Sequence, residues 1–425
     1  MSAPQLTVLL SGTDAGRVTR DSRRRLSFVY DDAWRRSADA YPLSLSMPLG
    51  AAEHPHDRIE PFLWGLLPDN DRIIDRWARD FHVGRDAFSL LAHVGEDCAG
   101  AVQLLPDEPG RSGDPVGRGR VEWITEDDVA ERLRALRTDQ AAWRRLGDSG
   151  QFSLAGAQAK TALLLRDGRW GIPSGRTPTT HILKPPVPDL AGHVENEHFC
   201  LELAREVGLP TARSEVRHFA SEVALVVERY DRVRHRGGVL RLHQEDCCQA
   251  LGVMPTRKYE NQGGPGPRHV IELLREASSA PLDDVRTFVD ALAFSWLVAG
   301  TDAHAKNYSL LLASEGRVRL APLYDLGSIL LYPELETRKI KLAMKIGSTY
   351  VLEQIGRRHW ATLAKDARLH PDEVLERVCA MAEGLPDAAE RVAGLSRSSG
   401  LSAATIDRLA AAIARHARDC RTALD

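Results

Sequence analysis

The sequence predicts an α+β chain with an N-terminal α/β unit, a β-containing lobe and a helical lobe. Three observations support this fold class. The chain has 425 residues, more than a single hydrophobic core usually organises. β-like runs dominate up to about residue 235, and helical periodicity dominates after it. A stretch rich in Pro, Gly and Arg, without hydrophobic periodicity, separates the first unit from the second.

Composition indicates a soluble, cytoplasmic protein. Hydrophobic residues make up 43% and charged residues 27%, and no apolar run reaches the length of a membrane span. The N-terminus lacks the basic start of a signal peptide. The six cysteines form no C-x-x-C pair, which argues against a zinc ribbon or a disulfide framework. The net charge of −3 leaves DNA contact to a partner.

The N-terminal unit is predicted over residues 1–106 and a surface linker over 107–120. Short apolar runs indicate strands, and two amphipathic patterns indicate helices, the first with Asp69 as a possible cap. The strands are expected at residues 6–10, 25–30, 43–49 and 100–106, and the helices at 70–81 and 86–95.

The β-containing lobe is predicted over residues 121–235. It opens with a helix for which Thr125 and Asp128 resemble a capping box. A second helix is expected over residues 195–208. Strand-like sequence is expected at 152–165, then after a turn at 167–169, and at 181–184 and 222–231.

The helical lobe is predicted over residues 236–425. Apolar residues recur at helical spacing in four segments, broken by one hairpin signal at 308–325. The helices are expected at 268–278, 283–300, 371–384 and 406–419. A β-containing lobe followed by a helical lobe is the layout of a bilobal kinase.

The most informative segment is TDAHAKN, in which Asp302 and Asn307 have the D-x-x-x-x-N spacing of kinase catalytic loops. Asp325 follows after the predicted hairpin. Phosphoryl transfer needs a carboxylate for the attacking hydroxyl and oxygen ligands for magnesium, which these three residues supply. The spacing alone occurs by chance in many chains. Its position after the most apolar helix of the sequence favours the functional interpretation.

The phosphate-binding side is less distinct. The segment FSLAGAQAKTALLL has a single glycine, so it lacks G-x-G-x-x-G, and Ala159 before Lys160 rules out a Walker A loop. The small residues Ala155, Gly156 and Ala157 could let backbone N–H groups approach phosphates. An ordinary hairpin turn explains the segment equally well.

Lys184 is the last residue of a strand-like run, and the two prolines that follow it end the strand. This position suits a strand lysine that reaches phosphates. Glu197 in the next helix could pair with it, and Glu195 is the competing candidate. The segment from Glu228 to Tyr230 could offer backbone groups to an adenine ring. A solvated helix face and an edge strand are the simpler interpretations.

Along nearly its whole length the chain resembles the HipA family of bacterial toxin kinases. The matching motifs include FSLAGAQAKTALLL, TPTTHILKP, VVERYDR, KYENQGGPG, TDAHAKN, APLYDL and KLAMKIG, in family order. The resemblance implies a protein-kinase-like fold with an added N-terminal subdomain, and it implies ATP and Mg²⁺ as cofactors.

The resemblance also assigns roles to individual residues. Asp302 resembles the catalytic aspartate, Asn307 and Asp325 the metal ligands, and Ser153 the serine that is autophosphorylated in trans. The resemblance also implies five groups of nucleotide contacts. They are a phosphate loop of Ala155, Gly156, Ala157, Gln158, Ala159 and Lys160; the lysine Lys184; a hinge of Glu228, Arg229 and Tyr230; the segment His304, Ala305, Lys306 and Asn307; and the segment Tyr324 and Asp325.

The implied partners are those of a toxin–antitoxin system. A small HipB-like helix-turn-helix antitoxin would bind the N-terminal unit and carry the complex to operator DNA, placing it at the nucleoid. The N-terminal unit would thus serve antitoxin contact and lobe stability rather than phosphate chemistry. An aminoacyl-tRNA synthetase, most simply the glutamyl enzyme, would be the phosphorylated target.

Two other functions fit part of the pattern. A small-molecule kinase of the aminoglycoside phosphotransferase type shares D-x-x-x-x-N and a later metal aspartate, but it leaves the first hundred residues unexplained. A corepressor that binds ATP and the antitoxin without catalysis would not require intact Asp302, Asn307 and Asp325. Labelling of proteins or small molecules would separate the first rival, and ATP turnover the second.

Overall fold

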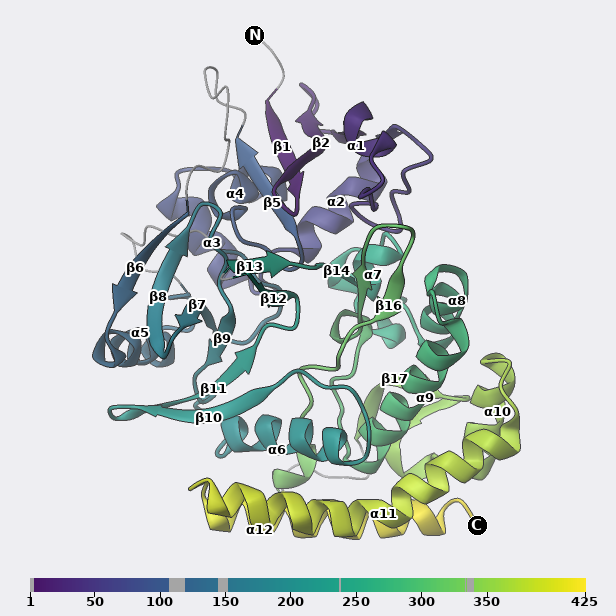
Figure 1. Ribbon diagram of the computed structural model, residues 1–425. Helices are drawn as coiled ribbons and strands as arrows, with labels where there is room; N and C mark the ends of the chain where they lie inside the picture. Colours follow the sequence, from purple (N-terminus) through teal and green to yellow (C-terminus); the bar gives the residue numbers. More distant parts are fainter. Residues whose placement is uncertain (1–3, 107–118, 144–151, 237, 333, 335–339) are drawn as a thin grey trace. The chain divides into compact units, whose positions relative to one another are not determined.

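The computed structural model describes residues 4–106, 119–143, 152–236, 238–332, 334 and 340–425, and Figure 1 shows the order of its elements. The chain forms two compact units, which are described separately. The first comprises Met1–Pro185, Arg217–Thr256 and Leu310–Val318, and the second comprises Pro186–Val216, Arg257–Ser309 and Arg319–Asp425. Compared with the expected lobes, residues 236–256 group with the first unit and 186–216 with the second. Most of the expected linker, 107–118, lies outside the described residues.

The first unit begins with a five-stranded sheet of order β4-β3-β2-β1-β5. All its described pairings are antiparallel. The strands are β1 (Gln5–Leu10), β2 (Thr13–Arg20), β3 (Leu26–Tyr30), β4 (Glu53–His54) and β5 (Val102–Pro106), and the helices are α1 (Asp32–Arg36), α2 (His56–Gly65), α3 (Asp71–Asp80) and α4 (Ala87–Val94).

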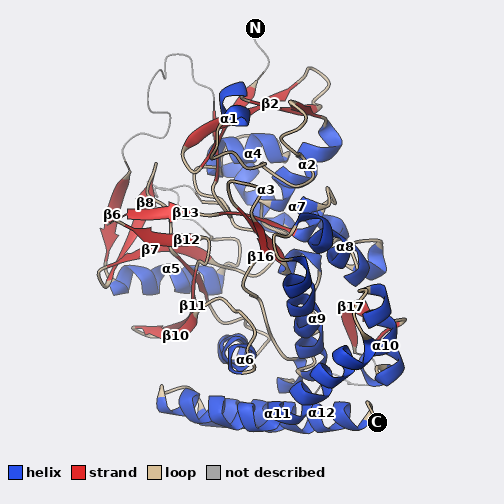
Figure 2. Ribbon diagram, turned by 45° about the vertical axis from the view of Figure 1, so that its right-hand side comes forward, coloured by secondary structure: helices blue, strands red, loops and turns tan. Residues whose placement is uncertain are grey.

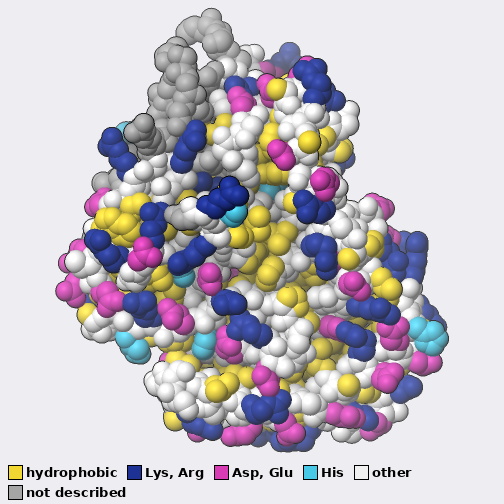
Figure 3. All heavy atoms as spheres, in the orientation of Figure 1, with side chains coloured by type: hydrophobic (Ala, Val, Ile, Leu, Met, Phe, Trp, Pro, Cys, Tyr) yellow, Lys and Arg dark blue, Asp and Glu magenta, His cyan; other side chains and the backbone are white. Residues whose placement is uncertain are grey.

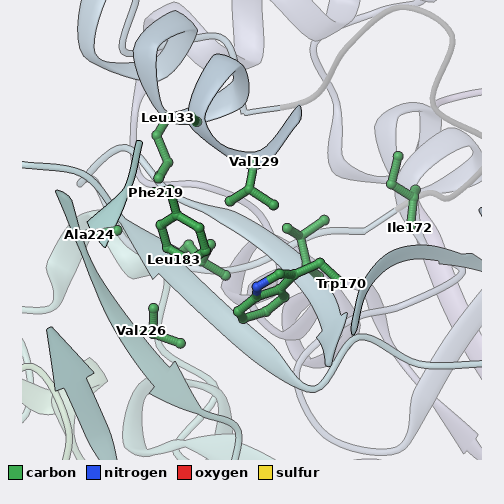
Figure 4. Packing of buried hydrophobic residues seen from close by; sticks show 10 residues of the cluster. Val129, Leu133, Trp170, Ile172, Leu183, Phe219, Ala224 and Val226 are labelled. Atoms are coloured by element: carbon green, nitrogen blue, oxygen red, sulfur yellow. The ribbon is translucent and has the colours of Figure 1, made fainter. Parts of the chain in front are cut away.

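A six-stranded sheet of order β10-β11-β9-β7-β8-β6 follows, with α5 against one face. In Figure 4, Val129 and Leu133 of α5 face Trp170, Phe219 and Val226 of the sheet, all buried. Burying such large apolar side chains is the main contribution to folding here. The elements are β6 (Arg120–Ile124), α5 (Glu126–Thr138), β7 (Thr161–Arg166), β8 (Arg169–Ser174), β9 (His181–Lys184), β10 (Ser214–Phe219) and β11 (Glu222–Glu228).

Local sequence explains two features of this sheet. The predicted capping box at Thr125 is confirmed, since its side chain accepts from the Asp128 N–H while the Asp128 carboxylate accepts from the Thr125 N–H. The predicted turn joins β7 to β8 through Asp167 and Gly168, both with positive φ. Asp and Gly tolerate that conformation, which is the one a two-residue hairpin requires.

Three short strands and one helical turn complete the first unit. The hairpin of β12 (Arg232–His235) and β13 (Gly238–Arg241) is antiparallel, with Arg232 opposite Arg241. β14 (His243–Asp246) follows and leads directly into α7 (Cys247–Ala250).

The second unit is mainly helical, as predicted. Figure 1 shows α11 and α12 side by side, and the ion pairs Arg397–Asp407 and Arg421–Glu383 join them. Figure 2 shows β17 beside α10; this short hairpin was not predicted. The elements are α6 (His193–Glu206), α8 (Pro267–Ala277), α9 (Pro281–Leu297), β17 (Lys341–Ile346), β18 (Thr349–Val351), α10 (Arg357–Asp366), α11 (Pro371–Ser398) and α12 (Ala403–Thr422). The strands β15 (Ser309–Leu312) and β16 (Val318–Leu320) cross the division, because Leu310–Val318 belongs to the first unit, where β15 pairs with β14.

Helix α9 is the central support of the second unit. Most of its side chains are buried, from Val285 to Leu297. Asp284 in its first turn accepts two bonds from the Arg319 guanidinium and one from the Leu320 N–H, which fixes β16 to the helix start. Asp290 pairs with Arg377 of α11. Among the helices of the described residues, none is long and apolar enough to cross a membrane.

Two sequence predictions in the N-terminal region are wrong. Residues 43–49 form a turn rather than a strand, because their backbone donors are used elsewhere: the Met47 N–H donates to the carbonyl of Ser44 and the Leu45 N–H to Glu245 Oε1. The cap of α3 is Asn70, not Asp69: its side chain accepts from the Arg72 N–H at 3.0 Å.

The first unit contains a buried ionic cluster that the sequence did not predict. It consists of Asp97, Asp231, Arg229, Arg232 and Arg241, and we call it the Asp97 cluster. Asp97 Oδ1 accepts from Arg232 at 2.9 Å and from Arg241 at 3.2 Å. Asp231 Oδ2 accepts from Arg229 at 2.9 Å and from Arg232 at 2.8 Å. The cluster therefore joins the N-terminal region to the end of β11 and to the β12–β13 hairpin.

The arginines decide the charge state of Asp97. Burial alone would raise its pKa, but attraction to Arg232, Arg229 and Arg241, with a hydrogen bond from Thr179, holds the pKa well below its usual range. Asp97 is therefore ionised in the folded protein. In the unfolded chain its pKa returns to the ordinary value, so it takes up a proton at higher pH than in the folded protein. Its contribution to stability is complete above the ordinary pKa of about 4 and is lost as pH falls below it.

We predict that Asp97→Asn lowers the free energy of unfolding at pH 7 by about 3 kcal/mol, because it leaves three buried guanidiniums with one carboxylate. Chemical denaturation measures this. The wild type should also lose stability between about pH 5 and pH 3 more steeply than the variant. Asp14→Asn, which breaks the solvent-accessible pair with Arg17, is the control and should have little effect. An equal loss in both variants would contradict the role of the cluster.

Candidate active site

The loop that carries Asp302 begins where α9 ends. Ala299 has φ +51° and the Gly300 N–H donates to the Ser295 carbonyl, which closes the helix and turns the chain sharply. Ser295 and the residues around it are buried. The loop is thus mounted on a rigid, buried helix end.

Inside the loop, Asn307 is fixed by Asp302. The carbonyl of Asp302 accepts from the His304 N–H at 2.8 Å and from Asn307 Nδ2 at 2.7 Å. The Asn307 N–H also donates to the carbonyl of His304. Because the amide nitrogen of Asn307 is bound to the loop itself, its oxygen points away and suits a hard cation.

The carboxylate of Asp302 is 68% exposed, unlike the buried side chains of His304, Ala305 and Lys306. Oδ1 accepts a hydrogen bond from the Tyr259 hydroxyl at 2.8 Å, and His304 Nε2 lies 3.9 Å from it. A solvent-facing carboxylate on a rigid loop can receive the proton of an incoming hydroxyl.

Asp325 is delivered beside this loop by the predicted hairpin, β15 and β16. The hydroxyl of Tyr324 donates to the carbonyl of Lys306 at 2.6 Å and lies 2.6 Å from Ser309 Oγ. On the other side, the Asn196 amide bonds both the carbonyl and the N–H of Ser328. Asp325 is therefore held by contacts before and after it.

The backbone of Asp325 is unusual, with φ +53°, in the left-handed region that non-glycine residues avoid. Its side chain is exposed. Such a conformation persists only when its surroundings impose it, and it commonly marks a functional site. The second unit thus brings together the predicted residues Asp302, His304, Asn307, Tyr324 and Asp325.

The donor set fits magnesium better than a structural metal. The described residues contain no group of three or more His, Cys, Asp and Glu side chains that could hold an ion. Asp325 and Asn307 are the two residues of the site that could supply oxygen ligands. Mg²⁺ bound with phosphates needs one or two carboxylates and takes its remaining ligands from phosphate and water.

The small-residue loop, residues 155–160, lies in the first unit. Lys160 is buried, and its ammonium donates to the carbonyl of Ala155 at 2.7 Å and lies 5.0 Å from the centre of the Trp143 ring. Gly156 has φ +99°, and a Cβ there would lie 2.6 Å from Lys160 Nζ. The single glycine of the segment is therefore required for the lysine to close the loop.

Residues from the N-terminal region hold this loop. The turn between α2 and α3, residues 66–70, contributes the Asp69 N–H to the carbonyl of Gly156 at 3.1 Å and Asn70 Nδ2 to the carbonyl of Ala157 at 3.4 Å. Pro68 also pairs with Gly156 in an isolated β-bridge. From its sequence, the N-terminal unit was expected to serve antitoxin contact and lobe stability rather than phosphate chemistry. In the structure, its residues 66–70 also help to place the small-residue loop.

Ser153 is fully buried beneath the same contacts. Its hydroxyl donates to the carbonyl of Leu66 at 2.7 Å, and its N–H donates to the carbonyl of Asp97 at 3.0 Å. The hydroxyl is thus inaccessible to any other molecule in this arrangement. The bonds of Ser153 to Leu66 and Asp97 anchor the segment that leads into the small-residue loop.

The other residues predicted to contact the nucleotide differ in their burial and position. Lys184 is buried at the end of β9, opposite Leu225 of β11. Glu197 is buried on α6, which excludes a solvated helix face, and Glu195 is half-buried. Lys184 and Glu197 belong to different units. Their pairing stays a prediction.

The hinge prediction needs one correction. The guanidinium of Arg229 lies in the Asp97 cluster with 2% of its side chain exposed. Its N–H donates to the carbonyl of Thr180 and its carbonyl accepts from the Arg232 N–H. The expected nucleotide contact of Arg229 therefore has no support, because its polar groups stabilise the fold. Glu228 ends β11 with an exposed side chain, and Tyr230 bonds Gln244.

A D-x-x-x-x-N loop on a buried helix end, an aspartate delivered by a hairpin, and a sheet-containing unit with a lysine at a strand end define the protein-kinase-like class. Comparison with known proteins narrows the class. The family model of the HipA N-terminal domain matches residues 6–105, and that of the HipA-like C-terminal domain matches residues 152–389. The chain belongs to the HipA family of kinases.

Individual relatives of the chain also support its membership of this family. The chain is 38% identical to a putative kinase, Y4mE, of Sinorhizobium fredii, over 100% of both chains. It is 30% identical to the serine/threonine-protein kinase toxin HipA of Shewanella oneidensis, over 76% of this chain and 73% of the relative. A solved complex of HipA, HipB and operator DNA from Shewanella oneidensis contains a similar chain, with a TM-score of 0.81 at 25% identity, covering 98% and 99% of the two chains.

We predict that Asn70→Ser loosens the small-residue loop. Serine preserves the cap of α3 but loses the amide that reaches Ala157. Losing one hydrogen bond should speed amide hydrogen exchange in residues 153–160 by about three- to tenfold, measured by mass spectrometry. Asn261→Ser, in the other unit, is the control and should leave that exchange unchanged. Unchanged exchange in Asn70→Ser would show that residues 66–70 do not hold the loop.

Proposed function

We propose that this chain is an ATP- and Mg²⁺-dependent serine/threonine protein kinase that acts as the toxin of a toxin–antitoxin system. The observation that carries the proposal is the arrangement of Asp302, Asn307 and Asp325 in one unit. Asn307 is bonded to the carbonyl of Asp302, and Asp325 is tied through Tyr324 to Lys306 of the same loop. Membership of the HipA family supports it.

In this proposal the residues of the second unit act on the reacting groups. Asp302 orients the hydroxyl of the acceptor serine or threonine and takes its proton. Asn307 and Asp325 hold Mg²⁺, with His304 to Lys306 beside them. Mg²⁺ held by these residues would neutralise charge that develops on the transferred phosphoryl group.

The residues of the first unit bind the nucleotide. The loop from Ala155 to Lys160, including Gln158 and Ala159, presents its backbone to the phosphates, and Lys184 supplies a positive charge. The backbone of Glu228 and Tyr230 contacts the adenine ring.

The proposed partners follow from the relatives. A helix-turn-helix antitoxin similar to HipB binds the kinase and brings it to operator DNA; the solved Shewanella complex contains these components. Positive and negative side chains are interspersed on the face drawn in Figure 3, which suits a chain that reaches DNA through its partner. The proposed target is a cytoplasmic aminoacyl-tRNA synthetase, of the glutamyl type, whose phosphorylation stops translation and growth.

Ser153 is the proposed site of inactivating autophosphorylation in trans. Its complete burial means that the segment must first leave the carbonyls of Leu66 and Asp97. A phosphate adds nearly two negative charges, which cannot return to this buried position beside the nucleotide phosphates. Phosphorylation would therefore hold the loop outside and switch the kinase off.

We predict that Asp302→Asn lowers the transfer of labelled phosphate from ATP to proteins of a host extract by at least about a hundredfold, because the amide cannot accept the proton. Growth arrest on expression should disappear with it. The melting temperature should be unchanged, since the side chain is exposed. Asp283→Asn, an exposed change at the start of α9, is the matched control. Near-normal labelling by the Asp302 variant would overturn the proposed mechanism.

A further inference from the structure

A loop before α8, residues 258–266, meets the catalytic aspartate within the second unit. The Tyr259 hydroxyl donates to Asp302 Oδ1 at 2.8 Å. The Tyr259 ring stands edge-on to His304, with centres 5.0 Å apart and planes at 79°. The Ala305 N–H donates to the carbonyl of Lys258 at 3.3 Å. The Tyr259 loop, as we call residues 258–266, therefore contacts the catalytic loop through backbone, ring and hydroxyl.

The far side of the Tyr259 loop is fixed to β17. Glu260 Oε2 accepts from the backbone N–H of Lys345 at 2.8 Å, and Oε1 lies 3.6 Å from the Lys345 ammonium. The carbonyl of Tyr259 accepts from the N–H groups of Gln262 and Gly264, each at 3.0 Å. These bonds leave the phenol little freedom to move.

The glycines of the segment are required by this close packing. A Cβ on Gly264 would lie 1.8 Å from the carbonyl oxygen of Arg257, and one on Gly266 would lie 2.3 Å from Cδ of Glu260. Neither position tolerates a side chain without displacing the backbone or the carboxyl anchor. The glycine-rich sequence thus makes a rigid support for Tyr259 rather than a flexible linker.

Asp302 needs such a support because its carboxylate is largely exposed. Its side chain has a hydrogen-bond donor at Oδ1 from Tyr259 and, in the part of the chain that the structure describes, none at Oδ2. A carboxylate held through one oxygen presents the other in a fixed direction. If the carboxylate is already fixed relative to the incoming hydroxyl, less conformational entropy is lost on reaching the transition state.

We propose that Tyr259 is a positioning residue for Asp302, and that Glu260 holds Tyr259 in place by its bonds to β17. The proposal rests on the proposed kinase function and deepens it. Tyr259 fixes Oδ1, which leaves Oδ2 to receive the proton of the acceptor hydroxyl. Neither Tyr259 nor Glu260 contacts the nucleotide in this account, so both act on turnover and not on ATP binding.

Tyr259→Phe tests the proposal, because it removes one hydroxyl and keeps the ring against His304. We expect the turnover number for labelling of host proteins to fall about tenfold, as for the loss of a hydrogen bond to a charged group. The KM for ATP should be unchanged. Tyr41→Phe, which removes a phenol hydroxyl bonded to Ser11 in the first unit, is the control and should leave the turnover number unchanged. Glu260→Ala should reproduce the lowered turnover number, and Glu260→Gln, which keeps an oxygen for the Lys345 N–H, should restore much of it.

The results separate this inference from the kinase assignment. If Asp302→Asn is inactive while Tyr259→Phe turns over like the wild type, the positioning role is refuted and the kinase stands. If Tyr259→Phe changes the KM for ATP as much as the turnover number, the phenol has a general structural role and the proposal fails. If Tyr259→Phe lowers the melting temperature, the Glu260 variants are compared instead. The proposal then requires that Glu260→Ala lowers the turnover number without changing the KM for ATP, and that Glu260→Gln restores much of the turnover number. Full activity of Asp302→Asn would refute the kinase mechanism itself.

Discussion

The arrangement of the first unit depends on Asp97. Its carboxylate lies among three buried guanidiniums, and its carbonyl accepts the N–H of Ser153. One residue therefore joins the N-terminal region to the ends of β11 and β13 and also holds the segment that leads into the small-residue loop. Removing either charge sign from such a cluster would leave the other buried and unpaired, which costs several kcal/mol. The N-terminal region is thus a structural part of the candidate nucleotide site.

In the second unit, hydrogen bonds to backbone groups hold the loop that carries Asp302. Asp302 and Asn307 lie in a loop without regular strands, so side chains and carbonyls supply the bonds that a ladder would provide: Asn307 to Asp302, Tyr324 to Lys306, and Asn196 to Ser328. Each bond is modest in net energy. Together they hold the Asp302 loop at the end of α9 and keep the neighbouring Asp325 in its left-handed backbone conformation.

Local patterns allowed much of this to be predicted from the sequence. Helical periodicity located α8, α9 and α12, and the pair Thr125 and Asp128 marked the start of α5. The D-x-x-x-x-N spacing and the hairpin to Asp325 located the catalytic half of the site. What could not be predicted were contacts between distant segments: nothing near Asp97 signals three arginines more than a hundred residues away. The nucleotide contact expected of Arg229 came from the family resemblance, which gives no information on the ion pairs of its side chain. Tyr259 was missed for the same reason, since its partner Asp302 lies 43 residues further along the chain.

In the mechanism that we propose, Asn307 and Asp325 bind the magnesium of ATP while Asp302 stays free to act on the acceptor hydroxyl. A crystal structure of the chain with Mg²⁺ and a non-hydrolysable ATP analogue tests it most directly. The account predicts a cation about 2.0–2.1 Å from the Asn307 side-chain oxygen and from an Asp325 carboxylate oxygen, bridged to nucleotide phosphates. Asp302 should lie near the terminal phosphate with Oδ1 still bonded to Tyr259. A nucleotide bound away from these residues, or a cation held without Asp325, would contradict the account.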